Sequence, residues 1–237
     1  RTRQGKPVKI SASPQLTPEN ILQTSRDQKG LQLIGLVDAA CRGVLHDLKS
    51  LVNEGRIEPT LGGGLSWQGV TLLLGSEIEI AHTTGKAAHF LAFFSDLESL
   101  SHYARHLSSW VTNPFLSTQR LNMAADAWLQ MVTDYGGVPL AAHAFTPHKG
   151  VYGNCVRKLG EMFKTPELIQ GLELGLSADT NMASQVTDTH SYAYISNSDA
   201  HSLASIGREF TVYDLPAVNF EEWKNALKQN GKGVVAN

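Results

Sequence analysis

The segment Ser196–Ser202 (SNSDAHS) carries the pattern with the clearest capacity for chemistry. Asp199 and His201 stand two residues apart after a predicted strand, where the turning chain can direct both side chains toward one centre. A carboxylate is a hard anionic ligand and an imidazole a borderline one, a mixture that suits zinc, manganese or iron. A second interpretation stays open at this point, in which Asp199 caps a following helix and His201 lies on its surface.

A second candidate segment is Gly75–Ile80 (GSEIEI). Because side chains of a strand alternate between its faces, Glu77 and Glu79 share one face and Ile78 points the other way. A carboxylate inside a barrel mouth is costly unless it is paired or binds a metal. Glu77, which lies closer to the glycine, is the better ligand candidate. The alternative is a pair of solvated carboxylates at a sheet edge.

Histidines at the ends of apolar runs extend the set. His143 ends the run 138–142, and His89 lies inside the run 87–94; each could instead be an ordinary core histidine. His148 follows Pro147 on a predicted loop, where it would contact substrate or solvent. Six side chains are thus candidate ligands: Asp38, Glu77, His89, His143, Asp199 and His201. Oxygen and nitrogen ligands in this number suit two or three divalent ions, which polarise a phosphoryl oxygen and generate hydroxide near neutral pH.

Short apolar runs alternate with segments of helical period along the whole chain. Strands are predicted at 31–37, 70–74, 87–94, 138–142, 172–176, 192–196 and 210–215, and helices at 18–29, 42–55, 95–111, 119–135, 151–164, 181–189 and 218–230. This alternation predicts βαβ units and a mainly parallel sheet. Since no GxGxxG loop follows the first strand, a barrel is favoured over a doubly wound sheet. In a barrel the catalytic groups gather at the C-terminal ends of the strands, where Asp38, Glu77, His143 and Asp199 are expected.

Length and composition suit one barrel or two small domains of ordinary globular character. The 237 residues carry a net charge of −2, so a nucleic-acid partner would need a local basic patch. Two distant cysteines argue against a disulfide framework, and no apolar run is long enough to span a membrane, which favours a cytoplasmic protein without a membrane partner. The chain opens on Arg1 without an initiator methionine, so a fragment of a longer polypeptide is one interpretation.

Six stretches resemble the PHP phosphoesterases, and more closely their endonuclease Q branch. They are LTPENILQTSRDQKGLQLIGLVDA, GSEIEI, HFLAFF, PLAAHAFTPHKGVYG, LELGLSADTNM and ISNSDAHSLASIGREF. The resemblance implies a distorted (β/α)7 barrel of the TIM-like PHP type with two or three divalent metals, zinc first and manganese, magnesium or iron as alternatives. It implies Glu77, His143, Asp199 and His201 as catalytic metal ligands, with His89 matching a further family histidine. The implied activity is cleavage of DNA next to a deaminated base (uracil, hypoxanthine or xanthine) or an abasic site in DNA repair.

The sequence departs from this family at two places. A family member begins with a strand carrying His-x-His, and Asp38 has no histidine beside it. We therefore expect residues 1–237 to be a single PHP domain that lacks this strand and a downstream zinc and DNA-binding region. Two alternatives remain: a PHP phosphatase of small molecules, which the lack of a strongly basic chain leaves open, or a degenerate module without activity, which the missing His-x-His supports.

Cationic side chains are the expected contacts to DNA. The candidates are Arg1, Arg120, Lys149 and His148, with Arg3, Lys6 and Lys9 on the first segment; each could also be plain surface charge. Phe145 and Tyr152 are candidate stacking partners for a flipped base. Damaged DNA is the expected partner, and a replication clamp or another repair protein is a further candidate.

Overall fold

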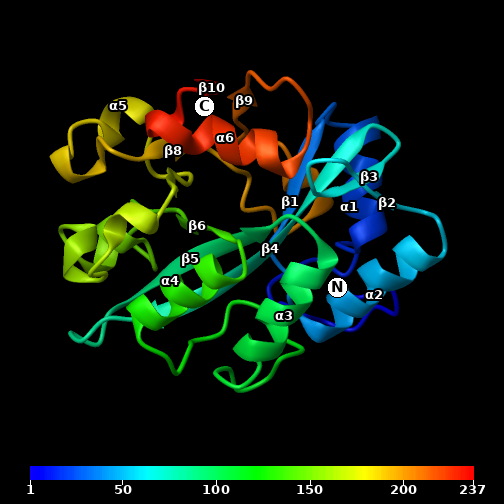
Figure 1. Cartoon of the computed structure of the whole chain (residues 1–237), viewed down its shortest axis with the longest axis horizontal. Coiled ribbons are helices and arrows are strands. Elements are labelled where there is room, and N and C mark those ends of the chain that lie inside the picture. Colours follow the sequence, from blue (N-terminus) through cyan, green and yellow to red (C-terminus); the bar gives the residue numbers. More distant parts are fainter.

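A curled mixed sheet forms the centre of the molecule in the computed structural model, which describes residues 1–237 (Figure 1). The strands of the sheet are β1 (Leu33–Leu36), β2 (Glu58–Pro59), β3 (Leu65–Trp67), β4 (Val70–Ala81), β5 (Ala87–Phe94), β6 (Val138–Ala141), β7 (Gly171–Glu173) and β8 (Ala193–Ile195). Their order is β2-β3-β4-β5-β6-β7-β8, with β1 paired to β4. A second sheet joins β9 (Val212–Tyr213) to β10 (Val234–Ala236).

Six α-helices and several short helical turns connect these strands. The α-helices are α1 (Pro18–Asp27), α2 (Arg42–Asn53), α3 (Leu97–Leu107), α4 (Ala125–Asp134), α5 (Thr180–Ala183) and α6 (Phe220–Gly231). The shorter turns are the π-helix Val151–Cys155 and four 3₁₀ turns at Leu159–Glu161, Pro166–Leu168, Thr187–Thr189 and Leu203–Ser205. The predicted start of the first helix is confirmed, since Thr17 caps α1 by accepting from the Asn20 N–H and Pro18 follows it.

The α/β class is confirmed, but the sheet is a curled half-barrel rather than a closed (β/α)7 barrel. Neither β1 nor β8 has a strand on its outer side, so the sheet stays open there. The expectation of a mainly parallel sheet was wrong for its centre, where β3, β4, β5 and β6 pair antiparallel. The cause is the short turn between β4 and β5, in which Gly85 takes a φ of +83°. Strands joined by so short a turn can only run antiparallel.

Other sequence-based boundaries also shift. The strand predicted at 70–74 extends past Glu77, because β4 continues to Ala81. The predicted helix 151–164 is replaced by short turns, since Gly150 and Gly153 approach the Thr146 carbonyl so closely that a Cβ would lie 2.3 and 2.2 Å from its oxygen. The predicted strand 210–215 shortens to β9 and belongs to the small second sheet.

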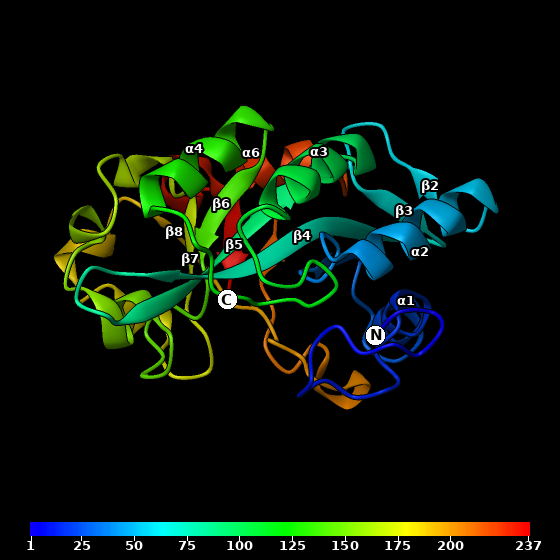
Figure 2. The same cartoon turned by 90° about the horizontal axis from the view of Figure 1, so that it is seen from below.

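Strand β5 separates two apolar clusters because its side chains alternate between its faces. Phe94 packs on Tyr103 of α3 with ring centroids 4.6 Å apart, whereas Phe93 packs on Trp223 of α6 at 5.3 Å. His89 shares the face of Phe93 by the two-residue period of a strand. Figure 2 shows α3 and α4 on one side of the sheet, and the N-terminal segment close to the segment around residue 200 on the other. The Ser13 N–H donates to the His201 carbonyl at 2.8 Å and ties these two segments together.

A large groove opens on the face that carries His89 and Phe93. Its volume is about 640 Å³, and its walls include β1 on one side and Ile195 of β8 on the other. The deep part is apolar, with Leu91, Phe93 and Trp223. The polar side chains Asp38, Glu77, Glu173, Asp199 and His201 also line this groove. None of the helices is long and apolar enough to cross a membrane.

Candidate metal centre

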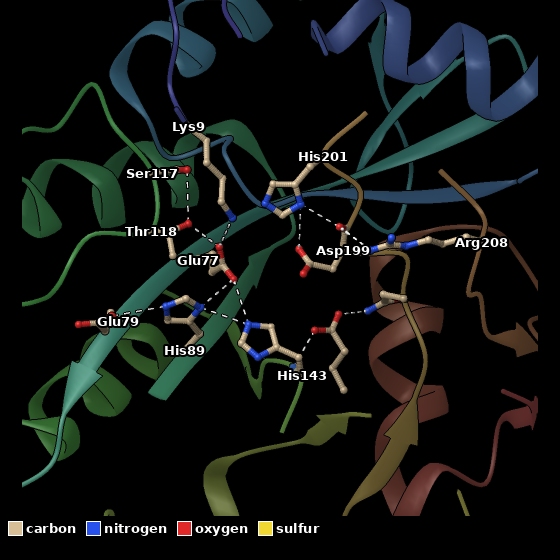
Figure 3. Close-up of polar contacts among 12 residues, drawn as sticks. Lys9, Glu77, Glu79, His89, Ser117, Thr118, His143, Asp199, His201 and Arg208 are labelled. Atoms are coloured by element: carbon tan, nitrogen blue, oxygen red, sulfur yellow. Dashed lines mark hydrogen bonds and ion pairs between the residues drawn. The ribbon is translucent and has the colours of Figure 1, made fainter. Parts of the chain in front are cut away.

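Glu77, His89 and His143 come together at the polar part of the groove (Figure 3). Strands β4 and β5 pair Glu77 with Leu91 and Glu79 with His89, so Glu77 and His89 are diagonal neighbours on one face. His143 follows β6 in a left-handed backbone conformation with a φ of +31°. Its N–H donates to Glu173 Oε2 at 2.9 Å, which anchors the turn that carries the imidazole.

The donor atoms of these three side chains converge on one point. The Nδ1 of His89 lies 3.2 Å from Nε2 of His143, and Glu77 Oε1 lies 3.4 and 3.7 Å from the same two nitrogens. All three donor atoms are within 4.8 Å of one another. Two imidazoles and a carboxylate are the ligands that zinc, manganese and iron accept, and a set of three leaves positions open for water or substrate. This set can therefore hold a divalent metal of the catalytic type.

The second carboxylate oxygen of Glu77 faces away from this cluster. Oε2 accepts from the Lys9 ammonium at 2.9 Å and from the Thr118 hydroxyl. Burial by itself would raise the pKa of Glu77, but hydrogen bonds with His143 and His89 and the charge of Lys9 outweigh it and hold the pKa well below 4.5. Glu77 is consequently an anion, as a metal ligand must be.

His143 and Glu173 form a second buried pair. Burial alone would lower the pKa of His143, but the hydrogen bond to Glu77 and the nearby Glu173 raise it above 6.5. The pKa of Glu173 is raised by its burial, although Asn197 Nδ2 donates to its Oε1 at 2.8 Å. The Nδ1 of His143 is buried without a protein partner. Glu173, which lies in the stretch LELGLSADTNM, thus supports the backbone of His143.

Asp199 and His201 lie across the groove from Glu77 rather than inside the cluster (Figure 3). His201 Nδ1 is 3.0 Å from the Asp199 carbonyl oxygen and 3.7 Å from its carboxylate, and both side chains are partly exposed. Arg208 donates to the carbonyls of Ser198 and Asp199 and so holds the turn. Asp199 has a φ of +41°, a conformation that is uncommon outside glycine. Strained residues of this kind cluster at functional sites.

Asp38 also lines the groove without joining the three-residue cluster. One of its carboxylate oxygens is buried without a hydrogen-bond partner. Asp38 forms an isolated bridge with Ser76, next to Glu77, so its backbone lies close to the cluster. A buried oxygen without a partner is costly, which makes Asp38 a fitting additional donor for a cation.

The expected DNA contacts lie in three different surroundings. Arg120 and Lys149 flank the cluster and both bind Glu79. His148 is exposed on the loop before Lys149. The α-amino group of Arg1 donates to the Leu16 carbonyl at 2.9 Å, so this residue is tied to its own segment.

Of the remaining candidates, Lys6 is exposed and the others are engaged with protein partners. Lys9 enters the site itself, and Arg3 pairs with Glu54 at 2.7 Å on the surface. Phe145 and Tyr152 stack on each other with centroids 5.4 Å apart, and the Tyr152 hydroxyl donates to Asp188.

Sequence reasoning overlooked Thr118 and Arg208. Thr118 is remote from every motif, and only the pairing of the 114–121 segment with β4 brings it to Glu77. Arg208 lies in the stretch ISNSDAHSLASIGREF. Its closeness in sequence to Asp199 was the one feature that could have identified it as part of the site. Lys9 was assigned to DNA on the basis of its charge alone, whereas the structure places its ammonium on the central carboxylate.

Two uncharacterized proteins are similar to this chain in sequence. No model of a known protein family matches the sequence. The uncharacterized protein YqxK of Bacillus subtilis (strain 168) is 38% identical over 240 residues, which covers all of this chain and 62% of that protein. The uncharacterized protein MJ0043 of Methanocaldococcus jannaschii is 35% identical over 102 residues, or 40% of this chain and 12% of that protein.

Solved structures extend the comparison to proteins of described activity. The crystal structure of the lesion-specific endonuclease PfuEndoQ from Pyrococcus furiosus superposes with a TM-score of 0.81 at 30% identity, covering 93% of this chain and 53% of that protein. A complex of endonuclease Q with a 27-mer duplex that has an abasic lesion at the active site matches with the same TM-score of 0.81. A protein assigned as a metal-dependent phosphoesterase from Bifidobacterium adolescentis matches at a TM-score of 0.53 and 15% identity over 85% of this chain and 90% of that one, a likeness that shows the fold alone.

The chain spans 62% of YqxK and 53% of PfuEndoQ, so both relatives are considerably longer. Over the shared part, sequence identity, fold and the Glu/His/His cluster all agree with the resemblance found in the motifs. The likeness to endonuclease Q that the motifs indicated is thus confirmed over 93% of the chain, and the metal-dependent phosphoesterase shares its fold.

Proposed function

We propose that this chain is the metal-dependent core of a DNA endonuclease that cleaves a phosphodiester bond next to a damaged nucleotide. The observation that carries the proposal is the match to endonuclease Q over 93% of the chain at 30% identity. The related complex has an abasic lesion at its active site. We therefore propose abasic sites as one substrate, with uracil, hypoxanthine and xanthine in DNA as the others.

The residues of the groove have separate roles in this proposal. Glu77, His89 and His143 hold the first divalent metal, and Asp38, Asp199 and His201 provide ligands for a second or third. When bound, such ions polarise a phosphoryl oxygen and lower the pKa of water, so that hydroxide forms near neutral pH. Zinc is the first choice for these ligands, and manganese, magnesium and iron are alternatives.

Cations at the mouth of the groove are the proposed contacts to the DNA backbone. Lys149 and Arg120 flank the Glu77 cluster, and His148 lies exposed beside Lys149. Arg1 stays a weaker candidate because its α-amino group is bound within its own segment. The whole chain carries a net charge of −2, so this local patch has to supply the electrostatic attraction. A replication clamp or another repair protein as a further partner remains a prediction.

The open side of the sheet supports a proposal about domain organisation. The groove of about 640 Å³ separates β1 from β8, and no strand lies beyond either of them. We propose that a strand carrying His-x-His fits between them, completes the barrel and adds two imidazoles opposite Glu77. A zinc and DNA-binding region beyond the barrel is proposed from the resemblance alone.

The decisive experiment measures cleavage of a labelled duplex. Duplexes with one abasic site, one uracil or one hypoxanthine, and an undamaged duplex, are incubated with the purified chain and Zn²⁺ or Mn²⁺. We expect cleavage next to the lesion, none of the undamaged strand, and none with Asp199→Asn. Hydrolysis of small phosphate esters with intact damaged duplexes would favour the phosphatase alternative instead. Absence of metal binding would favour the degenerate module.

A further inference from the structure

Glu79 lies beside the three proposed metal ligands, and their arrangement does not account for a further carboxylate there. It lies in β4 directly opposite His89 of β5, and its side chain is only 13% exposed. Its carboxylate is not one of the three converging donors, which belong to Glu77, His89 and His143. A largely buried carboxylate is costly unless a partner compensates its charge.

Three side chains surround this carboxylate. Arg120 Nε lies 2.6 Å from Oε1, Lys149 Nζ lies 2.8 Å from Oε2, and His89 Nε2 lies 3.6 Å from the same Oε2. Arg120 and Lys149 thus balance the charge of this carboxylate. Figure 3 shows His89 between Glu79 on one side and Glu77 with His143 on the other.

The backbone keeps the three partners in register. The His89 N–H donates to the Lys149 carbonyl at 2.9 Å, and the Leu121 N–H donates to the Glu79 carbonyl at 2.8 Å. The loops that carry Lys149 and Arg120 are therefore bonded to the same two strands that carry Glu79 and His89. Arg120 and Lys149 each reach the carboxylate through a short contact.

Orientation of His89 follows from these contacts. A negative carboxylate facing Nε2 favours the tautomer with the proton on that nitrogen, which leaves the lone pair of Nδ1 directed at His143 and Glu77. Carboxylates that face the outer nitrogen of a ligating histidine fix its ring and raise its basicity, and their loss typically weakens metal binding about 10- to 100-fold.

We infer that Glu79 is a positioning residue that couples DNA binding to metal binding. This inference rests on the proposed function, since it takes Arg120 and Lys149 as contacts to the phosphate backbone. A phosphate that binds the two cations draws them from Glu79, whose carboxylate then acts more strongly on His89 and tightens metal binding. Because such coupling is reciprocal, metal also tightens DNA binding by the same factor.

The test measures Zn²⁺ affinity by competition with a chromophoric chelator, without DNA and with a duplex carrying a non-hydrolysable abasic analogue. Wild-type protein should bind Zn²⁺ about 5- to 10-fold more tightly with the duplex, within the usual range of coupling between two sites. Glu79→Gln should bind Zn²⁺ about 10- to 100-fold more weakly without DNA, and adding the duplex should not increase its Zn²⁺ affinity. Glu58→Gln, at an exposed glutamate of β2, is the matched control and should behave as wild type.

Unchanged Zn²⁺ affinity in Glu79→Gln overturns the positioning role, and an equal gain on adding duplex in both proteins overturns the coupling. Either result leaves the proposed nuclease standing if wild type still cleaves the damaged strand. Wild-type protein that binds neither Zn²⁺ nor damaged duplex would overturn the proposed function and this inference together.

Discussion

At the scale of single residues, the two oxygens of Glu77 have different partners. Oε1 faces the imidazoles of His89 and His143, whereas Oε2 receives Lys9 and Thr118. Oε1 therefore faces the proposed metal position, and the contacts of Oε2 hold the carboxylate in place. Lys9 and Thr118 thus orient Glu77, as further hydrogen bonds commonly do for carboxylate ligands in metal sites.

Replacing His143 tests whether this side chain is a metal ligand, and a nearby surface histidine provides the comparison. His143→Ala removes one of three converging donors, so we expect loss of stoichiometric Zn²⁺ binding by metal analysis after dialysis. His148→Ala, five residues on in an exposed position, is the matched control and should retain the metal. Equal metal content in both variants would contradict the assignment of the cluster.

The Glu77–His143 pair should also determine how stability depends on pH in the presence of a chelator. The pKa of Glu77 is lowered below 4.5, so its contribution is present above that value and is lost as pH falls through the lowered pKa. The pKa of His143 is raised above 6.5, so its contribution is present below 6.5 and is lost as pH rises through the raised pKa. This pair therefore stabilises the metal-free protein most between these two values.

Urea unfolding with a chelator at about pH 6 and about pH 8.5 measures this effect. We expect a smaller free energy of unfolding at the higher pH for the wild-type protein. In Glu77→Gln the difference between the two pH values should shrink, because the partner that raises the pKa of His143 has lost its charge. An unchanged difference would show that His143 is not paired in solution.

At the scale of elements, the sequence-based prediction of a helix at 151–164 failed directly after the loop that begins at His143. Two glycines pack against the Thr146 carbonyl and bend the chain, which leads from His143 in the cluster to Lys149 beside Glu79. The short π-helix Val151–Cys155 closes this loop. Such single π turns are frequent at functional sites, where they redirect a segment that a regular helix would carry away.

Gly153→Ala should disturb this loop while leaving the rest of the fold intact. Its Cβ would lie 2.2 Å from the Thr146 carbonyl oxygen, so the backbone has to move. We expect Zn²⁺ affinity to fall at least about 10-fold, as when support of a ligand is lost. Gly160→Ala, where a Cβ meets nothing within 4 Å, is the control and should keep wild-type affinity. Far-UV circular dichroism verifies that both variants fold.

At the scale of the whole molecule, the site depends on segments that are distant in the chain. The N-terminal segment places Lys9 on Glu77, and its Ser13 N–H binds the His201 carbonyl. Glu77 of the same cluster lines the groove between β1 and β8, where the further strand is proposed to lie. The proposed metal binding therefore depends on the complete half-barrel rather than on any one motif.

Extending the chain with a His-x-His strand ahead of Arg1 tests this dependence. We expect the extended protein to bind two or more metals and to cleave uracil-containing duplex at a higher rate than the present chain. An extension of equal length with Ala-x-Ala should fill the groove without adding metal. Equal metal content in the two extended proteins would refute the proposed place of the strand.

The sequence by itself determined the α/β class, the first helix cap at Thr17 and the side chains that form the Glu/His/His cluster. These features depend on local periodicity, capping and residue type, which a single chain displays directly. Only the tertiary structure decided that β4 and β5 form one long antiparallel hairpin, that the half-barrel stays open, and that Asp199 and His201 lie across the groove. The contacts of Glu77 with Lys9 and Thr118, which are 68 and 41 residues away, could not be predicted either. Strand pairing and long-range packing bring these groups together, and neither leaves a periodic signal in the sequence.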